Sequence, residues 1–288
     1  MSCRQSETRF TVETKRVTLF LLSLLCVTIL SGKRDASKIT QTSQEITLER
    51  RVFNSTRLIL TGASENHAEV LKEWLEVHSF LREYCTVIVY DLGMKLDSRE
   101  RLAATHTWVH WETFLYDSYP DHVNITNASG CYAWKPLIIS KYASQPVSIL
   151  WLDSGVRMTG GANALNWIFD HIDSRGFFTT STGPSVRRWV HKGTRDFLLG
   201  TNQSDFLNLE VCNAAVLGFH HRSPIPSDFA ACALDAECIC PRTSSRANHR
   251  QDQAVVTILL YLHFGISLRF PPQVGFTLHT SQYEHKGE

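Results

Sequence analysis

The sequence has almost no excess of charge of either sign, because its 288 residues carry 29 Lys and Arg against 28 Asp and Glu. Proteins that bind nucleic acid or adsorb to membranes through a basic face carry a strong positive excess, so the composition argues against both classes. The chain also lacks Pro-rich and Gln-rich tracts and internal repeats. Its seven Trp, eight Tyr and fifteen Phe are ample for a globular core.

Two signatures of common enzyme classes are also missing. The chain contains neither a Gly-x-Ser-x-Gly nucleophile elbow nor a Gly-x4-Gly-Lys-Ser/Thr phosphate loop. The pair Gly160-Gly161 is too sparse for a dinucleotide-binding fingerprint and is typical of a turn. Function must therefore be sought in residues that lie far apart along the chain.

Residues 17–32 form an uncharged apolar segment between Lys15-Arg16 and Lys33-Arg34. Its 16 residues fall short of the roughly 20 that span an average bilayer, which suits a thinner early-secretory membrane or a signal peptide. The polar lead and the lack of an Ala-x-Ala-like cleavage site favour a retained anchor over a cleaved signal peptide. We therefore expect a cytoplasmic tail (1–16), a transmembrane signal-anchor (17–32), a polar stem (33–56) and a folded domain (57–288).

Basic residues flank the segment on both sides, so charge alone does not set its orientation. Four glycosylation acceptor tripeptides predict that the body of the chain is lumenal. They begin at Asn54, Asn124, Asn127 and Asn202. Six cysteines follow the apolar segment, an even number that predicts disulfides in an oxidising lumen and leaves their connectivity open. They are Cys85, Cys131, Cys212, Cys232, Cys238 and Cys240.

Short apolar runs alternate with helix-like stretches over the body of the chain, which predicts an α/β fold. The predicted strands cover residues 58–61, 86–90, 148–152, 176–180 and 213–219. Ser64 is placed to cap the first helix, on which His78 shares the apolar face. Later helices are predicted near residues 100–104, after Pro136, at 163–172 and from 251 to 264.

Three of the predicted elements place ionisable side chains where ligands bind. Asp153 directly follows the buried strand 148–152, and in open α/β sheets ligands bind outside the carboxyl ends of strands. A turn or helix cap is the alternative role for such an acid. Lys135 stands beside a helix N-terminus, where a cation is unfavourable unless it serves an anion or is solvated. Asp252 falls in the first turn of the last helix, where the dipole alone would favour it.

Five segments in this order resemble an animal family of nucleotide-diphospho-sugar transferase-like proteins, described as lumenal glycosyltransferases. The resemblance covers about residues 57–279 and implies a GT-A fold, a Rossmann-like α/β sandwich that binds the donor at its strand ends. The segments are Ser64-Glu65-Asn66-His67, Tyr90-Asp91-Leu92-Gly93, Tyr132-Ala133-Trp134-Lys135-Pro136, Leu150-Trp151-Leu152-Asp153-Ser154-Gly155 and His249-Arg250-Gln251-Asp252-Gln253.

The resemblance implies transfer of a sugar from a nucleotide diphosphate, which requires a positive group at the leaving diphosphate. Many GT-A enzymes hold Mn²⁺ or Mg²⁺ there with an Asp-x-Asp motif. The second carboxylate is missing here, because the matching residues are Asp153-Ser154-Gly155. Either Asp153 binds a metal with water and a distant His279, or Lys135 or Arg157 neutralises the diphosphate without a metal.

The resemblance also implies a general base for the acceptor hydroxyl. Asp252 is the candidate, with His249 orienting it or replacing it. Asp91 either contacts the ribose or base of the nucleotide or only forms the turn after its strand.

These expectations describe a hexosyl- or related transferase, anchored as a single-pass type II glycoprotein in the Golgi or ER membrane. Its partners would be a nucleotide sugar and a glycan, protein or lipid acceptor. A catalytically inactive lumenal binding protein that retains the fold is the alternative. A zinc module at Cys238, Cys240 and His249 is disfavoured, because one residue between the two cysteines is fewer than zinc motifs have.

Overall fold

The computed structural model describes residues 55–201, 203–271, 273 and 275–278. They belong to a compact unit that comprises residues 54–288. The predicted tail, the signal-anchor and nearly all of the stem lie outside the described residues. Within the described ranges, no helix is both long and apolar enough to cross a membrane.

A mixed, mostly parallel sheet of six strands forms the centre of this unit, in the order β3-β2-β1-β4-β9-β6. Strands β1 to β4 pair in parallel, and β9 runs antiparallel to its neighbours β4 and β6. The strands are β1 (Arg57–Ala63), β2 (Thr86–Asp91), β3 (His110–Thr113), β4 (Ser148–Leu152), β9 (Val216–Phe219) and β6 (Phe177–Phe178). The predicted α/β class is therefore confirmed.

The order of the strands creates one reversal in the path of the chain. From β1 the chain moves outward through β2 to β3, and it then returns to place β4 on the other side of β1. Because these four strands are parallel, their carboxyl ends share one edge of the sheet. The gap between β1 and β4 is the switch point at which open α/β sheets bind ligands.

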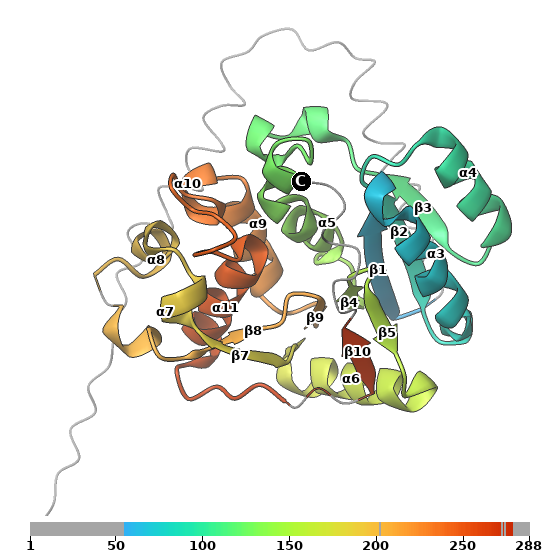
Figure 1. The fold of residues 1–288 in the computed structure, drawn as a ribbon. Helices are drawn as coiled ribbons and strands as arrows, with labels where there is room; N and C mark the ends of the chain where they lie inside the picture. The colour runs from blue at the N-terminus through green and yellow to red at the C-terminus, as the bar shows by residue number, and fades with distance from the viewer. Residues whose placement is uncertain (1–54, 202, 272, 274, 279–288) are drawn as a thin grey trace, which may run out of the picture. The chain divides into compact units, whose positions relative to one another are not determined.

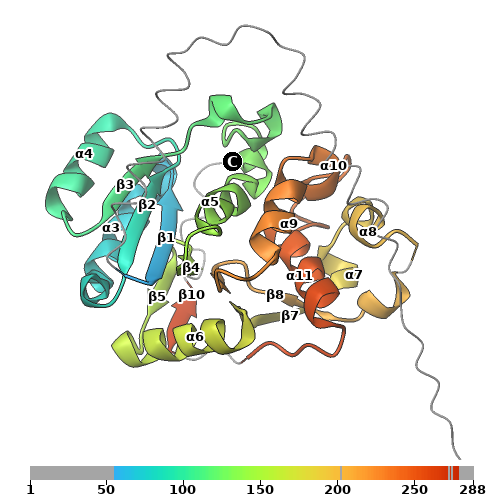
Figure 2. The ribbon, with the colours of Figure 1, turned by 180° about the vertical axis from the view of Figure 1, so that it is seen from behind.

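Helices cover both faces of the sheet (Figures 1 and 2). On one face, α3 (Ala68–Val77) and α6 (Gly161–Arg175) pack their apolar side chains against alternate residues of the strands. On the other face lie α5 (Trp134–Tyr142), α9 (Ile225–Ala233) and α11 (Gln251–Phe264). Strands buried on both faces must be apolar throughout, which explains the continuous apolar runs of β1 and β4.

A second, smaller core lies where α11 packs on β8 (Glu210–Cys212), which pairs antiparallel with β7 (Ser181–Ser185). It contains Ala254 and Ile258 from α11 and Val211 from β8. The remaining helices here are α7 (Val186–Trp189), α8 (Lys192–Leu199) and α10 (Ala236–Ile239). This core holds the N-terminus of α11, and with it Asp252, beside the carboxyl edge of the main sheet.

The other described elements are short. A two-stranded sheet joins β5 (Val156–Met158) to β10 (Phe276–Leu278), and α4 (Leu96–Thr105) connects β2 to β3. The 3-10 turns are η1 (Glu65–His67), η2 (Ser79–Glu83), η3 (Tyr116–Ser118), η4 (Asp121–Val123), η5 (Ala128–Tyr132) and η6 (Ser204–Phe206). The predicted helix cap at Ser64 is wrong, because its hydroxyl bonds the side chain of Asn66 and the chain first forms η1.

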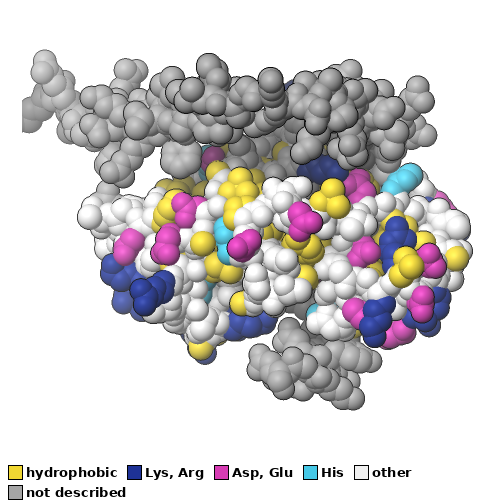
Figure 3. All heavy atoms as spheres, turned by 90° about the horizontal axis from the view of Figure 1, so that it is seen from above, with side chains coloured by type: hydrophobic (Ala, Val, Ile, Leu, Met, Phe, Trp, Pro, Cys, Tyr) yellow, Lys and Arg dark blue, Asp and Glu magenta, His cyan; other side chains and the backbone are white. Residues whose placement is uncertain are grey.

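Four of the six predicted disulfide cysteines are paired. Disulfides join Cys131 to Cys240 and Cys232 to Cys238, which also removes both cysteines of the zinc alternative. The prediction is wrong for Cys85 and Cys212, which are buried free thiols. On the face in Figure 3, acidic and basic side chains are interspersed over the described surface, in agreement with the balanced composition.

Candidate active site

A cleft of about 610 Å³ opens at the carboxyl ends of β1, β2 and β4, and we call it the strand-end cleft. Its walls come from the loop after β1, the loop after β2, the turn η5 with the start of α5, and the loop after β4. The polar and aromatic side chains that line it are Ser64, Glu65, Asn66, His67, Thr126, Ser129, Tyr132, Trp134, Lys135, Asp153 and Ser154. The sequence placed Asp153 at such an edge, and the structure confirms that location.

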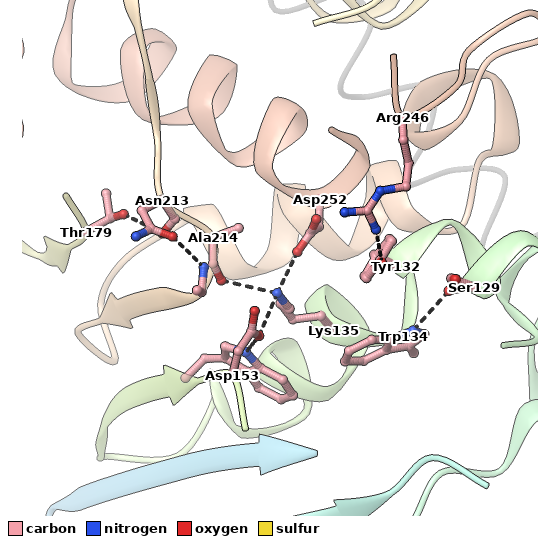
Figure 4. A network of polar contacts seen from close by, with 12 residues as sticks. Ser129, Tyr132, Trp134, Lys135, Asp153, Thr179, Asn213, Ala214, Arg246 and Asp252 are labelled. Atoms are coloured by element: carbon pink, nitrogen blue, oxygen red, sulfur yellow. Dashed lines mark hydrogen bonds and ion pairs between the residues drawn. The ribbon is translucent and has the colours of Figure 1, made fainter. Parts of the chain in front are cut away.

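Lys135 lies between two carboxylates at the base of the cleft, as Figure 4 shows. Its Nζ is 2.9 Å from Oδ1 of Asp153 and 2.7 Å from Oδ2 of Asp252. The same ammonium donates a hydrogen bond to the carbonyl of Ala214 at 3.2 Å. One side chain from α5 thus joins the end of β4, the loop before β9 and the N-terminus of α11.

Lys135, Asp153 and Asp252 form a trio of ionisable groups whose charges do not cancel. Burial by itself would lower the pKa of Lys135, but Asp153 and Asp252 outweigh it, so the pKa lies above its ordinary value. Burial raises the pKa of Asp252 although the neighbouring ammonium opposes this shift. With all three groups ionised the trio carries one net negative charge. The ammonium is therefore a fixed bridge between carboxylates instead of a surplus cation.

Asp153 is the member of the trio that is most exposed to the cleft. Its side chain is 39% exposed, against 3% for Lys135 and 8% for Asp252. Trp151 Nε1 donates to Asp153 Oδ1 at 2.6 Å, so that oxygen is held by both the indole and the ammonium. The carboxylate is thereby fixed at the end of β4, in reach of a ligand in the cleft.

Asp252 lies behind Lys135, and it is absent from the residues that line the cleft. The resemblance implies that it faces an acceptor hydroxyl as general base. The structure instead gives it a close contact with the ammonium, because α11 presents its first turn to the buried end of the lysine. Its geometry is that of a residue that positions Lys135.

His249 also differs from its expected role. The ring is fully buried, its Nδ1 accepts from the N–H of His191, and its Nε2 lies 2.8 Å from the carbonyl of Ile239. With Nδ1 accepting, Nε2 carries the proton and donates. Both nitrogens are therefore occupied by backbone groups, and His249 tethers the segment before α11 instead of orienting Asp252.

Arg157 and Asp91 are engaged in holding the backbone. The guanidinium of Arg157 donates to the carbonyls of Ser154 and Val70 and pairs with Glu73, so its fork is not aimed into the cleft. Asp91 Oδ1 accepts from two N–H groups in the turn after β2. The expected diphosphate role of Arg157 is therefore not supported, and Asp91 has the turn role that the sequence left open.

The described residues do not fit a resident divalent metal ion. Mn²⁺ and Mg²⁺ require several oxygen ligands, yet Asp153 Oδ1 is already bonded and Glu65 accepts from Lys95 and Ser98. No group of three or more His, Cys, Asp and Glu within the described ranges could hold an ion. His279, the predicted distant ligand, lies outside the described residues.

The most informative side chains that sequence reasoning missed are the aromatic residues of the cleft. Tyr132 and Trp134 line it, and the Trp134 ring centroid is 5.8 Å from that of the buried Trp151. Both tryptophans stand close to Lys135, at 5.9 and 5.6 Å from the ammonium to the ring centroids. These aromatic residues could have been found from the sequence, because they stand next to Lys135 and Asp153 in the segments that carry the resemblance.

Two of the four predicted glycosylation sites can be located. Asn127 is exposed and Asn124 is half-buried, in the stretch between η4 and η5. Asn124 Oδ1 accepts from the hydroxyl of Thr126 within its own tripeptide. Asn54 and Asn202 lie outside the described residues.

No family model matches this chain, and no curated protein matches it. Among solved structures, it is similar to the galactosyltransferase LgtC in complex with donor and acceptor sugar analogs, with 14% identity and a TM-score of 0.48 over 78% of this chain and 87% of that one. It is also similar to mouse xyloside xylosyltransferase 1 in its apo form, with 15% identity and a TM-score of 0.43 over 75% of this chain and 84% of that one. The apo form of the glycosyltransferase GlyE of Streptococcus pneumoniae has 12% identity and a TM-score of 0.40 over 78% of this chain and 55% of that one. Similarity at these levels bears on neither the substrate nor the chemistry.

Proposed function

We propose that this protein is a glycosyltransferase that binds a nucleotide-diphosphate sugar in the strand-end cleft and transfers the sugar to an acceptor. The observation that carries the proposal is that sequence segments far apart in the chain meet at this cleft. Each of the five segments that resemble the nucleotide-diphospho-sugar transferase-like family reaches the cleft or the trio beneath it, although they span residues 64 to 253. Segments that only stabilised the fold would have no reason to meet at one cleft.

The position of the cleft supports a nucleotide ligand. It lies at the switch point between β1 and β4, where open α/β sheets hold nucleotides. The loops after β1 and β2 contribute polar groups from Ser64 to His67 and the backbone at Gly93. This arrangement supports a GT-A-type domain with the nucleotide over β1 and β2 and the sugar near Asp153.

The reaction would break the bond between the anomeric carbon and the diphosphate oxygen and form one to the acceptor oxygen. The acceptor hydroxyl gives up its proton to the departing diphosphate, and the nucleoside diphosphate leaves with the electron pair of the broken bond. Asp153 is the fixed carboxylate within reach, so we assign to it the hydrogen bonds of the sugar and acceptor hydroxyls. Lys135 and Trp151 hold Asp153, and Asp252 holds Lys135.

Lys135 and the N-terminus of α5 are the positive groups at this wall of the cleft. The lysine stands in the first turn of α5, so the partial positive charge of the helix end and the ammonium lie together. The two aspartates outweigh the ammonium when all three groups are ionised, so the trio offers no net positive charge to a diphosphate. The missing second carboxylate of the Asp-x-Asp motif favours the alternative of a lumenal protein that binds a sugar nucleotide without transferring the sugar.

We further propose that the domain is lumenal, behind a single-pass type II signal-anchor in the Golgi or ER membrane. Two observations support an oxidising lumen, namely the disulfides Cys131–Cys240 and Cys232–Cys238 and the exposed acceptor Asn127.

Release of nucleoside diphosphate by the full-length protein tests the proposal. The protein is incubated with a panel of sugar nucleotides, in Mn²⁺ and in chelator, with and without a mixture of glycoside, glycoprotein and glycolipid acceptors. Release above the rate of a boiled sample is the expected result. Thermal stabilisation by one sugar nucleotide without any release would select the binding protein.

A further inference from the structure

The turn η5 has a backbone that amino acids with side chains rarely adopt. Its five residues, from Ala128 to Tyr132, all have left-handed dihedrals, with φ of 48, 58, 60, 50 and 53°. For residues other than glycine, each such position costs free energy because Cβ crowds the neighbouring backbone. A continuous run therefore persists only where surrounding contacts enforce it, and such strain is concentrated at ligand-binding sites.

The surrounding contacts hold this turn at three points. A disulfide joins Cys131 to Cys240 in the segment after α10. Gly130 lies so close to η4 that a Cβ atom on it would be 2.2 Å from the carbonyl oxygen of Val123. The indole of Trp134 donates to the carbonyl of Ser129 at 3.2 Å. The conformation is thus fixed by covalent, steric and polar contacts together.

The result of this conformation is a wall of the strand-end cleft. Ser129 and Tyr132 line the cleft directly, and the Tyr132 ring centroid is 6.1 Å from that of Trp134. On its other side, Tyr132 accepts a hydrogen bond of 2.5 Å from Arg246, so its phenol is fixed (Figure 4). Trp134 in turn lies over Trp151, whose indole holds Asp153.

A row of aromatic rings therefore runs from Asp153 through the buried Trp151 and Trp134 to Tyr132, on the wall that η5 and the start of α5 build, and Tyr132 is the ring of this row that is not buried. The opposite loops, after β1 and β2, are those assigned to the nucleotide. Pyranose rings present faces of C–H groups that pack on aromatic rings, while their hydroxyls take hydrogen bonds from polar groups at the ring edges. Ser129 provides such a group beside these rings.

We propose that Tyr132, held by the left-handed turn η5, is the acceptor-recognition residue and stacks on a sugar ring of a glycan acceptor. This inference rests on the proposed function, because it assumes that the donor occupies the loops after β1 and β2. It assigns the acceptor to the class of glycans instead of unglycosylated protein or lipid.

A glycan array tests the proposal through binding, without need for turnover. The full-length protein is applied to immobilised N-linked, O-linked and glycolipid-type oligosaccharides in the presence of UDP, and the best-bound oligosaccharide is then titrated. Tyr132→Ala is expected to weaken its binding about tenfold, the scale of one aromatic contact. Tyr132→Phe, which keeps the ring, is expected to stay within about threefold of the unaltered protein.

Absence of binding to every oligosaccharide, or equal binding by Tyr132→Ala and the unaltered protein, would overturn the proposal. Nucleoside diphosphate release without acceptor is measured on the same samples. Release that persists in Tyr132→Ala beside unchanged glycan binding would reject this inference and leave the proposed function standing. Glycan binding that depends on Tyr132 without any release would reject only the transfer reaction.

Discussion

At the scale of single residues, Lys135 is the side chain on which the site depends. Its side chain is 3% exposed, and its ammonium separates Asp153 from Asp252. Lys135→Met would leave two carboxylates facing each other without a counter-charge, and removal of one partner from a buried ion pair costs about 3–5 kcal/mol. We expect that loss in the free energy of unfolding of the full-length protein, measured in urea by tryptophan fluorescence.

Lys192→Met is the matched control, because Lys192 also pairs with an aspartate but is 72% exposed. Exposed pairs contribute about 0–1 kcal/mol, so this variant should remain close to the unaltered protein. If Lys135→Met were no more destabilised than Lys192→Met, the trio would not be the buried bridge described above.

The sequence indicated each of the three residues of this trio as a candidate, but it did not indicate that they contact one another. Asp153 was marked by the end of a buried strand, and Asp252 and Lys135 by the first turns of helices. That the lysine is held by both acids could not be predicted, because the contact joins residues 117 positions apart through the packing of α5 and α11 on α9. The expected diphosphate role of Arg157 fails for the same reason, because its partners Val70 and Glu73 lie on α3, far from it in the sequence.

At the scale of secondary structure, His78 connects α3 to β5. Its Nδ1 lies 2.7 Å from the carbonyl of Trp74, and its Nε2 accepts from the N–H of Met158 at 3.0 Å. Nδ1 therefore carries the proton, the ring is neutral, and burial lowers its pKa to about 4. The unfolded chain, with an ordinary pKa near 6.5, binds a proton at higher pH than the folded protein.

This difference makes His78 stabilise the fold fully above about pH 6.5 and lose that contribution as pH falls toward 4. The free energy of unfolding should decline by up to about 1.4 kcal/mol per pH unit for this residue across the window. His78→Gln should flatten the decline by that slope in urea unfolding between pH 4 and 7. The exposed His110→Gln is the control, and equal slopes in the two variants would contradict the account.

Most elements of the central sheet could be predicted from the sequence, because β1, β2 and β4 are buried on both faces and are continuously apolar. Strand β3 was not recognised, since its two central residues are only half-buried at the edge of the sheet and it has no apolar run. The pairs β5–β10 and β7–β8 were also missed. Each of these strands is three to five residues long, which is too short for a reliable period.

At the scale of the whole molecule, the proposed lumenal topology predicts N-linked glycans. After expression of the full-length chain in animal cells, N-glycosidase should increase its gel mobility. Asn127→Gln should remove one glycan, because Asn127 is exposed. Thr126→Ala should remove the one on Asn124 while leaving that asparagine in place. Mobility that N-glycosidase does not change would contradict the topology.

The central claim of the account is that Asp153 contacts the reacting sugar in the strand-end cleft. The most direct test compares nucleoside diphosphate release by full-length Asp153→Asn and Asp170→Asn, with the sugar nucleotide that the unaltered protein turns over fastest. Asp170 is an exposed aspartate on α6, so its variant should keep the full rate. We expect Asp153→Asn to lose about 10²–10³-fold in rate, the scale of removing one group that stabilises a transition state, while a cooperative thermal unfolding transition shows that the variant is folded. Full release by Asp153→Asn would contradict the account.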